Sequence, residues 1–265
     1  MKPDEIRIAT LSRTGGRERN EDACGFLFTG SGGPGCCVLS DGAGGHGGGD
    51  IASRIAVKSV LEAFAASPPA SPPELASLIA RANHEVIREQ SSADSQRDMR
   101  ATLVVLSFDP DRDVALWGHV GDSRLYWFRG GYVAARTKDH SLVQSMIDAG
   151  LGNPDTLRAG PDRSVLIASL GGDDGFEPDI VDAPRSLQPG DAFILCSDGF
   201  WEYVSDRAME AALQRVATPD DWLASLEQVV LAAARPGHDN YSAVAVWYGA
   251  MDFTTRSPTR DAAPA

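Results

Sequence analysis

Four aspartates lie where an apolar run meets a tight turn, and they are the residues best placed to do chemistry. They are Asp22 in Arg-Asn-Glu-Asp-Ala, Asp41 in Leu-Ser-Asp-Gly, Asp198 in Cys-Ser-Asp-Gly and Asp239 in His-Asp-Asn. Carboxylates that gather at strand ends repel one another and lose solvation, so they stay together only when cations neutralise them. The pattern therefore predicts a metal site with oxygen ligands.

The ligand types narrow the choice of metal. Carboxylate and carbonyl oxygens suit Mg²⁺ or Mn²⁺, whereas zinc sites usually recruit His or Cys, and the five histidines lack metal-finger spacing. An EF-hand pattern is absent as well. Asp41 opens the glycine-rich stretch 41–50, in which the backbone can approach an ion closely, so Gly42 is a candidate carbonyl ligand.

A simpler interpretation competes with each motif. A single Asp-Gly after an apolar run is usually only a turn. Ser-Asp-Gly occurs twice after such runs, however, and a third run ends in Gly-His-Val-Gly-Asp122-Ser-Arg124, so the set together favours a site. For Asp122 the alternative stays open that it closes a turn and pairs with Arg124.

Six segments in fixed order carry a resemblance to a known family. They resemble the motifs of the PP2C (PPM) protein serine/threonine phosphatases, in their bacterial stand-alone form, and extend over about residues 8 to 248. The segments are 12–23, 40–46, 118–124, 138–143, 196–199 and 239–240.

The resemblance implies a centre of two Mn²⁺ or Mg²⁺ ions with a bridging water that attacks phosphorus in line. Asp41 would bridge the ions, with the Gly42 carbonyl on one of them and Asp198 and Asp239 on the other. Glu21 and Asp22 would complete the centre, partly through coordinated waters. Arg17 would clamp the phosphate, because a guanidinium offers a planar fork of donors to two phosphate oxygens. The expected catalytic residues are Arg17, Glu21 and Asp41.

Further expectations follow from bacterial members of the family and from positions at which this sequence departs from the family's motifs. Bacterial members often bind a third ion near the equivalent of Asp122, sharing the equivalent of Asp198, and Asp162 is a candidate for an additional contact. Some relatives carry a His two residues after the bridging aspartate as a proposed general acid, and here that residue is Ala43. His46 lies further along the glycine stretch, and no acid role is transferred to it.

Composition excludes several classes of protein. A formal charge of -13 in 265 residues with no visible basic patch argues against nucleic-acid binding. The apolar runs are short against the roughly 20 residues of a transmembrane helix, and the first residues lack the apolar core of a signal peptide. Four cysteines fit reduced core thiols. We expect a cytoplasmic monomer with one phosphatase domain over residues 1–250 and a disordered tail over 251–265.

Periodicity indicates strands and helices in separate groups. Strands are predicted at 6–11, 24–29, 35–40, 102–108, 114–120, 124–129, 132–137, 192–197 and 242–247. Helices are predicted at 51–65 with Asp50 as N-cap, from Ser71 onward, and at 141–149, 207–216 and 220–234. Such elements imply two packed sheets covered by helices. The resemblance implies an α+β fold, the four-layer α/β/β/α sandwich of two antiparallel sheets flanked by helices.

Three hypotheses for the function remain. The favoured one is a metal-dependent phosphatase acting on phosphoserine and phosphothreonine in proteins and opposing a cognate Ser/Thr kinase in bacterial signalling. The others are a non-catalytic scaffold that keeps the fold, and a phosphohydrolase for small phosphate esters. The kinase and phosphatase pair that controls type VI secretion is one possible context, which the residues do not select.

Overall fold

The computed structural model describes residues 6–30, 32–43, 48–90, 98–153, 162, 164–172 and 176–251. Among these residues no helix combines the length and the apolar character that crossing a membrane requires. Of the tail predicted over 251–265, residues 252–265 lie outside the described residues.

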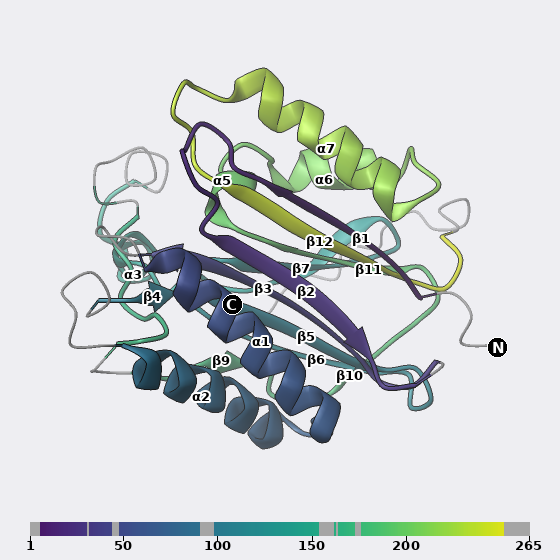
Figure 1. Cartoon of the computed structure of the whole chain (residues 1–265). Helices are drawn as coiled ribbons and strands as arrows, with labels where there is room; N and C mark the ends of the chain where they lie inside the picture. The colour runs from purple at the N-terminus through teal and green to yellow at the C-terminus, as the bar shows by residue number, and fades with distance from the viewer. Residues whose placement is uncertain are drawn as a thin grey trace.

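Two antiparallel sheets form the centre of the molecule (Figure 1). The five-stranded sheet has the order β1-β12-β11-β7-β8, and the seven-stranded sheet has the order β10-β6-β5-β3-β2, with β4 paired to β3 and β9 paired to β6. The first sheet comprises β1 (Ile6–Arg13), β7 (Arg124–Arg129), β8 (Tyr132–Arg136), β11 (Asp191–Cys196) and β12 (Tyr241–Tyr248). The second comprises β2 (Asp22–Phe28), β3 (Gly35–Ala43), β4 (Arg100–Ala101), β5 (Leu103–Asp109), β6 (Val114–Val120), β9 (Asp179–Ile180) and β10 (Arg185–Ser186).

Helices cover the outer face of each sheet. Figure 1 shows α7 and α6 over the sheet that contains β12, and α1 and α2 over the sheet that contains β3. Their bounds are α1 (Gly49–Ala66), α2 (Pro72–Glu89), α6 (Asp206–Leu213) and α7 (Pro219–Ala233). Two short helices, α3 (Leu142–Asp148) and α5 (Asp198–Trp201), belong to the connections.

Side-chain alternation divides the core into three layers. In β12, Ala243, Ala245 and Trp247 pack outward against α6 and α7, whereas Val244 and Val246 pack between the sheets. In β5, Leu103 and Val105 likewise face α1 and α2, whereas Val104 and Leu106 face the other sheet. Both faces of each sheet are thus buried, which confirms the four-layer α/β/β/α sandwich.

The predicted long elements are all present, and two details differ. Gly130 and Gly131 form the turn between β7 and β8, with positive φ angles of 61° and 83°. Asp50 is not the N-cap of α1, because the helix begins one residue earlier, with Gly48 as its cap, and Asp50 lies in the first turn. The two-residue strands β4, β9 and β10 escaped prediction because pairs of residues carry no periodicity.

Candidate metal centre

The structure brings the predicted aspartates to one end of the sandwich. Asp22 begins β2 and lies directly opposite Asp41 in the register of β2 and β3. Asp198 is the first residue of α5, directly after β11, and Asp239 precedes β12. Asp122 lies in the turn between β6 and β7. Because these strand ends meet at the same edge, five carboxylates far apart in sequence become neighbours.

A cavity of about 560 Å³ lies at this edge. The cavity is lined by seven of the eight catalytic and metal-binding residues that the sequence predicts. They are Arg17, Glu21, Asp41, Gly42, Asp122, Asp198 and Asp239. The eighth, Asp22, is buried beneath it. The cavity is large enough for a phosphorylated side chain.

Asp22 connects the two sheets. Its Oδ2 accepts a hydrogen bond of 2.8 Å from the Ser197 hydroxyl, and the same hydroxyl accepts one of 3.0 Å from the Ser242 N–H. Among the described residues, no donor reaches Asp22 Oδ1, although that atom is buried. A buried carboxylate oxygen without a donor is costly, and a cation is the partner that suits it.

The buried carboxylates of the acidic cluster repel one another, and their pKa values are raised. Burial, together with smaller contributions from the Asp198 and Asp239 carboxylates, raises the pKa of Asp22 to about 7. Burial, followed by repulsion from Asp22 and Asp198, holds the pKa of Asp41 well above its usual range. The pKa of Asp122 is raised well above its usual range by burial and by Asp198. Added positive charge is what would return these groups to the ionised form.

The spacing of the acids bears on the number of ions. In the described part of the chain, no three of these carboxylates bring an oxygen within 4.8 Å of one another. One ion bound by three carboxylates would need a tighter group. Two ions about 3.5–4 Å apart, sharing one carboxylate, would distribute their ligands over a wider group.

Gly42 is a position where a side chain cannot be accommodated. A Cβ atom there would stand 2.2 Å from the backbone of Gly49, where α1 begins. A Cβ atom on Gly49 would meet the Gly42 carbonyl at 2.8 Å and Glu21 Oε2 at 2.6 Å. The start of α1 therefore packs on Gly42, and Glu21 lies beside both. Burial raises the pKa of Glu21, and the nearby Asp50 and Asp239 add to this shift.

Arg17 contacts one of the proposed ligands. Its Nη2 lies 2.8 Å from Asp239 Oδ2, and both side chains are about half exposed. An ion pair this exposed contributes little to stability, so the guanidinium can leave it for another anion. Arg17 is thus at the cavity, as predicted, and in this state it faces a carboxylate.

Asn240 holds the segment that carries Arg17 and Glu21. Its side-chain oxygen accepts from the Glu21 N–H at 2.8 Å, and its amide nitrogen donates to the carbonyls of Thr14 and Arg19 at 2.7 and 2.9 Å. No sequence pattern predicts a role for this residue. Its place directly after Asp239 was the available signal, since buried polar side chains beside a site usually orient it.

The alternative pairing of Asp122 with Arg124 is wrong. Arg124 forms a buried, two-point ion pair with Asp139, at 2.7 and 2.6 Å, and its guanidinium lies 3.4 Å from the centre of the Trp201 ring. The Trp201 indole in turn donates to the Asp122 carbonyl at 2.9 Å. Asp122 therefore keeps its carboxylate for the cavity and is positioned through its backbone.

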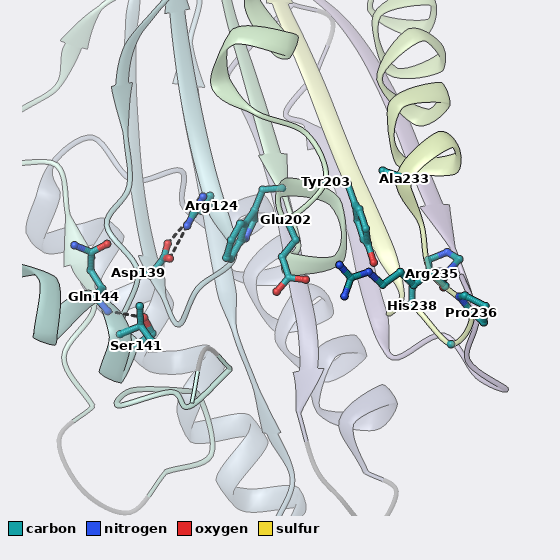
Figure 2. A pocket seen from close by; sticks show the side chains of 13 residues that line it. Arg124, Asp139, Ser141, Gln144, Glu202, Tyr203, Ala233, Arg235, Pro236 and His238 are labelled. Atoms are coloured by element: carbon teal, nitrogen blue, oxygen red, sulfur yellow. Dashed lines mark hydrogen bonds and ion pairs between the residues drawn. The ribbon is translucent and has the colours of Figure 1, made fainter. Parts of the chain in front are cut away.

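A second cavity, of about 570 Å³, flanks the first. Figure 2 shows the Arg124 and Asp139 pair on one side of it, and Arg235 and His238 on the other, with Glu202 and Arg235 extending toward each other. It adjoins the acidic cavity because Trp201 ends the helix that Asp198 begins, and His238 precedes Asp239.

Two weaker predictions have different outcomes. Asp162 is exposed and does not line the acidic cavity, although its neighbours Ser164 and Leu166 do. His46 lies outside the described residues. Ala43 lines the cavity, so an alanine stands where some relatives place a histidine.

Comparisons with known proteins agree with this geometry. The family model described as protein phosphatase 2C matches residues 12–240. The serine/threonine protein phosphatase PstP of Mycobacterium tuberculosis is 29% identical over 222 residues, which are 83% of this chain and 42% of PstP. The chain thus spans less than half the length of that relative.

Solved structures extend the likeness to the fold. The catalytic domain of the phosphatase PstP in complex with two manganese ions superposes with a TM-score of 0.77 at 26% identity, covering 92% of this chain and 98% of that one. PppA, described as a key regulatory component of T6SS in Pseudomonas aeruginosa, superposes with a TM-score of 0.72 at 29% identity, covering 92% and 97%.

Proposed function

The chain belongs to the protein phosphatase 2C family, and we propose that it is a metal-dependent phosphatase that removes phosphate from phosphoserine and phosphothreonine in proteins. The observation that carries this proposal is the cavity in which Asp41, Asp122, Asp198 and Asp239 converge with Arg17 at its side. Acids alone would repel a phosphate dianion, so the cavity suits this substrate only with cations bound.

The residues present fit a pair of divalent ions. Asp41 and the Gly42 carbonyl, with Glu21 and Asp22 nearby, would hold one, and Asp198 and Asp239 would hold the other. The buried Oδ1 of Asp22 and the raised pKa of Asp41 support this assignment. When bound, such ions neutralise phosphoryl charge and acidify water to a nucleophile. The oxygen-only ligand set favours Mn²⁺ or Mg²⁺, and the manganese complex of PstP supports Mn²⁺.

Arg17 would bind the phosphate. With Asp239 engaged as a metal ligand, its exposed contact with Arg17 would give way, and the guanidinium would be free to bind the phosphate oxygens. A guanidinium can meet two phosphate oxygens at once, which orients the phosphoryl group. Asn240 would hold Arg17 in position for this contact, because its three hydrogen bonds fix the backbone on both sides of Arg17.

Asp122 would hold a third ion together with Asp198. The Asp198 carboxylate is the first charged neighbour to raise the pKa of Asp122, so the two groups share one electrostatic environment. Position 43, where some relatives place a proposed general acid, is Ala43 in this chain, and an alanine side chain has no proton to donate.

Phosphoproteins are the proposed substrates, and a cognate Ser/Thr kinase is the proposed antagonist. Among the similar proteins, PstP is named a serine/threonine protein phosphatase, and PppA is described as a key regulatory component of T6SS. We place the chain in bacterial signalling in the cytoplasm, acting as a monomer, without assigning the pathway.

Phosphate release from a phosphothreonine peptide tests the function. We expect release with Mn²⁺, its loss in excess chelator, and its return when Mn²⁺ is added back. An Asp41→Asn variant should stay folded and inactive in all three conditions. Metal binding without release would favour the scaffold hypothesis, and faster hydrolysis of nucleotides or sugar phosphates than of peptides would favour the small-ester hypothesis.

A further inference from the structure

A second cluster of ligand-type side chains lies outside the acidic cavity. His119 near the end of β6, His140 in the segment before α3, and Asp179 in β9 come from three separate elements. One ligand atom from each lies within 4.8 Å of the others, and in the described part of the chain this is the one set of three His, Cys, Asp or Glu that meets this limit. We propose that these three residues bind a transition-metal ion of the zinc class.

The fold places the three side chains on one face. His119 lies opposite Asp179 in the antiparallel register of β6 and β9, so the two side chains project to the same side. The alternation of β6 puts His119 on the side of Ala115 and Trp117, which pack between the sheets. His140 reaches this side from the segment after β8, and its ring centre lies 4.6 Å from that of His119.

The spacing of His140 and Asp179 is that of two ligands on one ion. Nε2 of His140 lies 3.3 Å from Oδ2 of Asp179, which is long for a charge-assisted hydrogen bond of about 2.8 Å. Two ligands on a tetrahedral ion, each bonded at about 2.0–2.1 Å, stand roughly 3.3–3.4 Å apart. The pair can therefore accept an ion between them with little movement.

His119 is already in the form that a metal requires. Its Nε2 faces the Lys138 carbonyl at 2.7 Å, and since a carbonyl only accepts, Nε2 carries the proton. Nδ1 therefore carries the lone pair, and a ligand histidine held by a carbonyl through its other nitrogen is the usual arrangement. Burial lowers the pKa of His119 to about 4, and the nearby His140 ring contributes, so the ring is neutral at pH 7.

His140 must exchange one contact. The Gly121 N–H donates to its Nδ1 at 3.3 Å, so the proton of the neutral ring lies on Nε2, toward Asp179. An ion at Nε2 displaces that proton to Nδ1, and the long bond from Gly121 is lost. The adjustment falls on Gly121, the residue before Asp122.

The ligand set distinguishes this site from the acidic centre. Two imidazoles and one carboxylate suit Zn²⁺, Ni²⁺ or Co²⁺, and Mg²⁺ has little affinity for imidazole. The Asp179 side chain is 65% exposed, which leaves an approach from solvent and room for a water as fourth ligand.

Cobalt titration of the wild-type protein in excess Mg²⁺ tests the proposal. Mg²⁺ occupies the oxygen site, and Co²⁺ bound by histidines in four-coordinate geometry gives strong visible absorption. We expect one such Co²⁺ per chain and its displacement by one equivalent of Zn²⁺. Asp179→Ala should weaken Co²⁺ binding by about 100-fold, because it removes one of three direct ligands.

Asp182→Ala is the matched control, because Asp182 is an exposed acid three residues along the chain whose partner is Arg185. It should bind Co²⁺ like the wild type. In the wild type, Zn²⁺ added with excess Mg²⁺ should also shift the imidazole NMR signals of two of the five histidines. The absence of a four-coordinate cobalt spectrum, or equal affinity in the two variants, would show that the cluster is only a hydrogen-bonded clasp between β9 and the segment before α3.

Discussion

Replacing Asp22 with asparagine should stabilise the metal-free protein while removing its activity. Asp22 is buried, and its pKa is raised from 3.8 to about 7. Between these values the folded protein binds a proton that the unfolded protein has released, so this group's contribution to stability is full below about pH 4 and is lost as pH rises through 7. A difference of about 3 units corresponds to about 4 kcal/mol at pH 8.

Asparagine avoids that loss at a smaller cost. Its oxygen can accept the Ser197 hydrogen bond, but its NH₂ group replaces the Oδ1 that has no donor, and an unsatisfied buried donor costs about 1–3 kcal/mol. The net gain at pH 8 is therefore about 1–3 kcal/mol, or roughly 2–12 °C in Tm for a domain of this size. At pH 5, where Asp22 is protonated in the folded state, the gain should be much smaller.

Thermal unfolding of chelator-treated wild type and Asp22→Asn at pH 5 and pH 8 measures this difference. Asp191→Asn is the matched control, because Asp191 is also buried but makes a two-point ion pair with Arg129, at 2.8 and 2.6 Å. That variant should be destabilised at both pH values, because it leaves the guanidinium without its carboxylate. A destabilised Asp22→Asn at pH 8, or an equal gain at both pH values, would refute the account of the acidic cluster.

Three further variants test individual roles. Asp41→Asn should lower kcat on a phosphothreonine peptide by about three orders of magnitude while circular dichroism stays unchanged, and near-normal turnover would contradict the metal assignment. Arg17→Ala should raise KM by about tenfold with a Tm within about 2 °C of wild type, because its contact with Asp239 is exposed; an unchanged KM would remove its phosphate role. Asn240→Ala loses three hydrogen bonds, so we expect the free energy of unfolding to fall by about 3 kcal/mol and Tm by roughly 6–12 °C. We also expect a lower kcat/KM. Wild-type stability would show that Asn240 does not hold the segment that carries Arg17 and Glu21.

Much of the fold followed from local pattern. Short runs of apolar and β-branched residues predicted the long strands, and in β12 successive side chains of such a run are buried on opposite faces of the sheet. Helical period predicted α1, α2 and α7. Asp41 and Asp198 could be nominated because a carboxylate directly after an apolar run and before glycine lies at a strand end whatever the topology.

Other features depended on how distant segments meet. Asp22 contacts Ser197 across 175 positions, and Arg17 contacts Asp239 across 222, and no spacing along the chain encodes such contacts. The partner of Arg124 is another case: Asp122 is nearer in sequence, but Gly121, with a φ of 95°, turns the chain there, and Asp139 is the acid that Arg124 meets. The cluster of His119, His140 and Asp179 arises because β9 adds to the edge of β6.

The sequence by itself determined which groups can bind hard cations and which residues lie in strands, since both depend on side-chain chemistry and short-range periodicity. Tertiary structure alone decided which carboxylates share one cavity, which of them lack a donor, and where two histidines meet an aspartate. These depend on the packing of two sheets and on the burial that results, and burial is a property of the whole fold and not of any one segment.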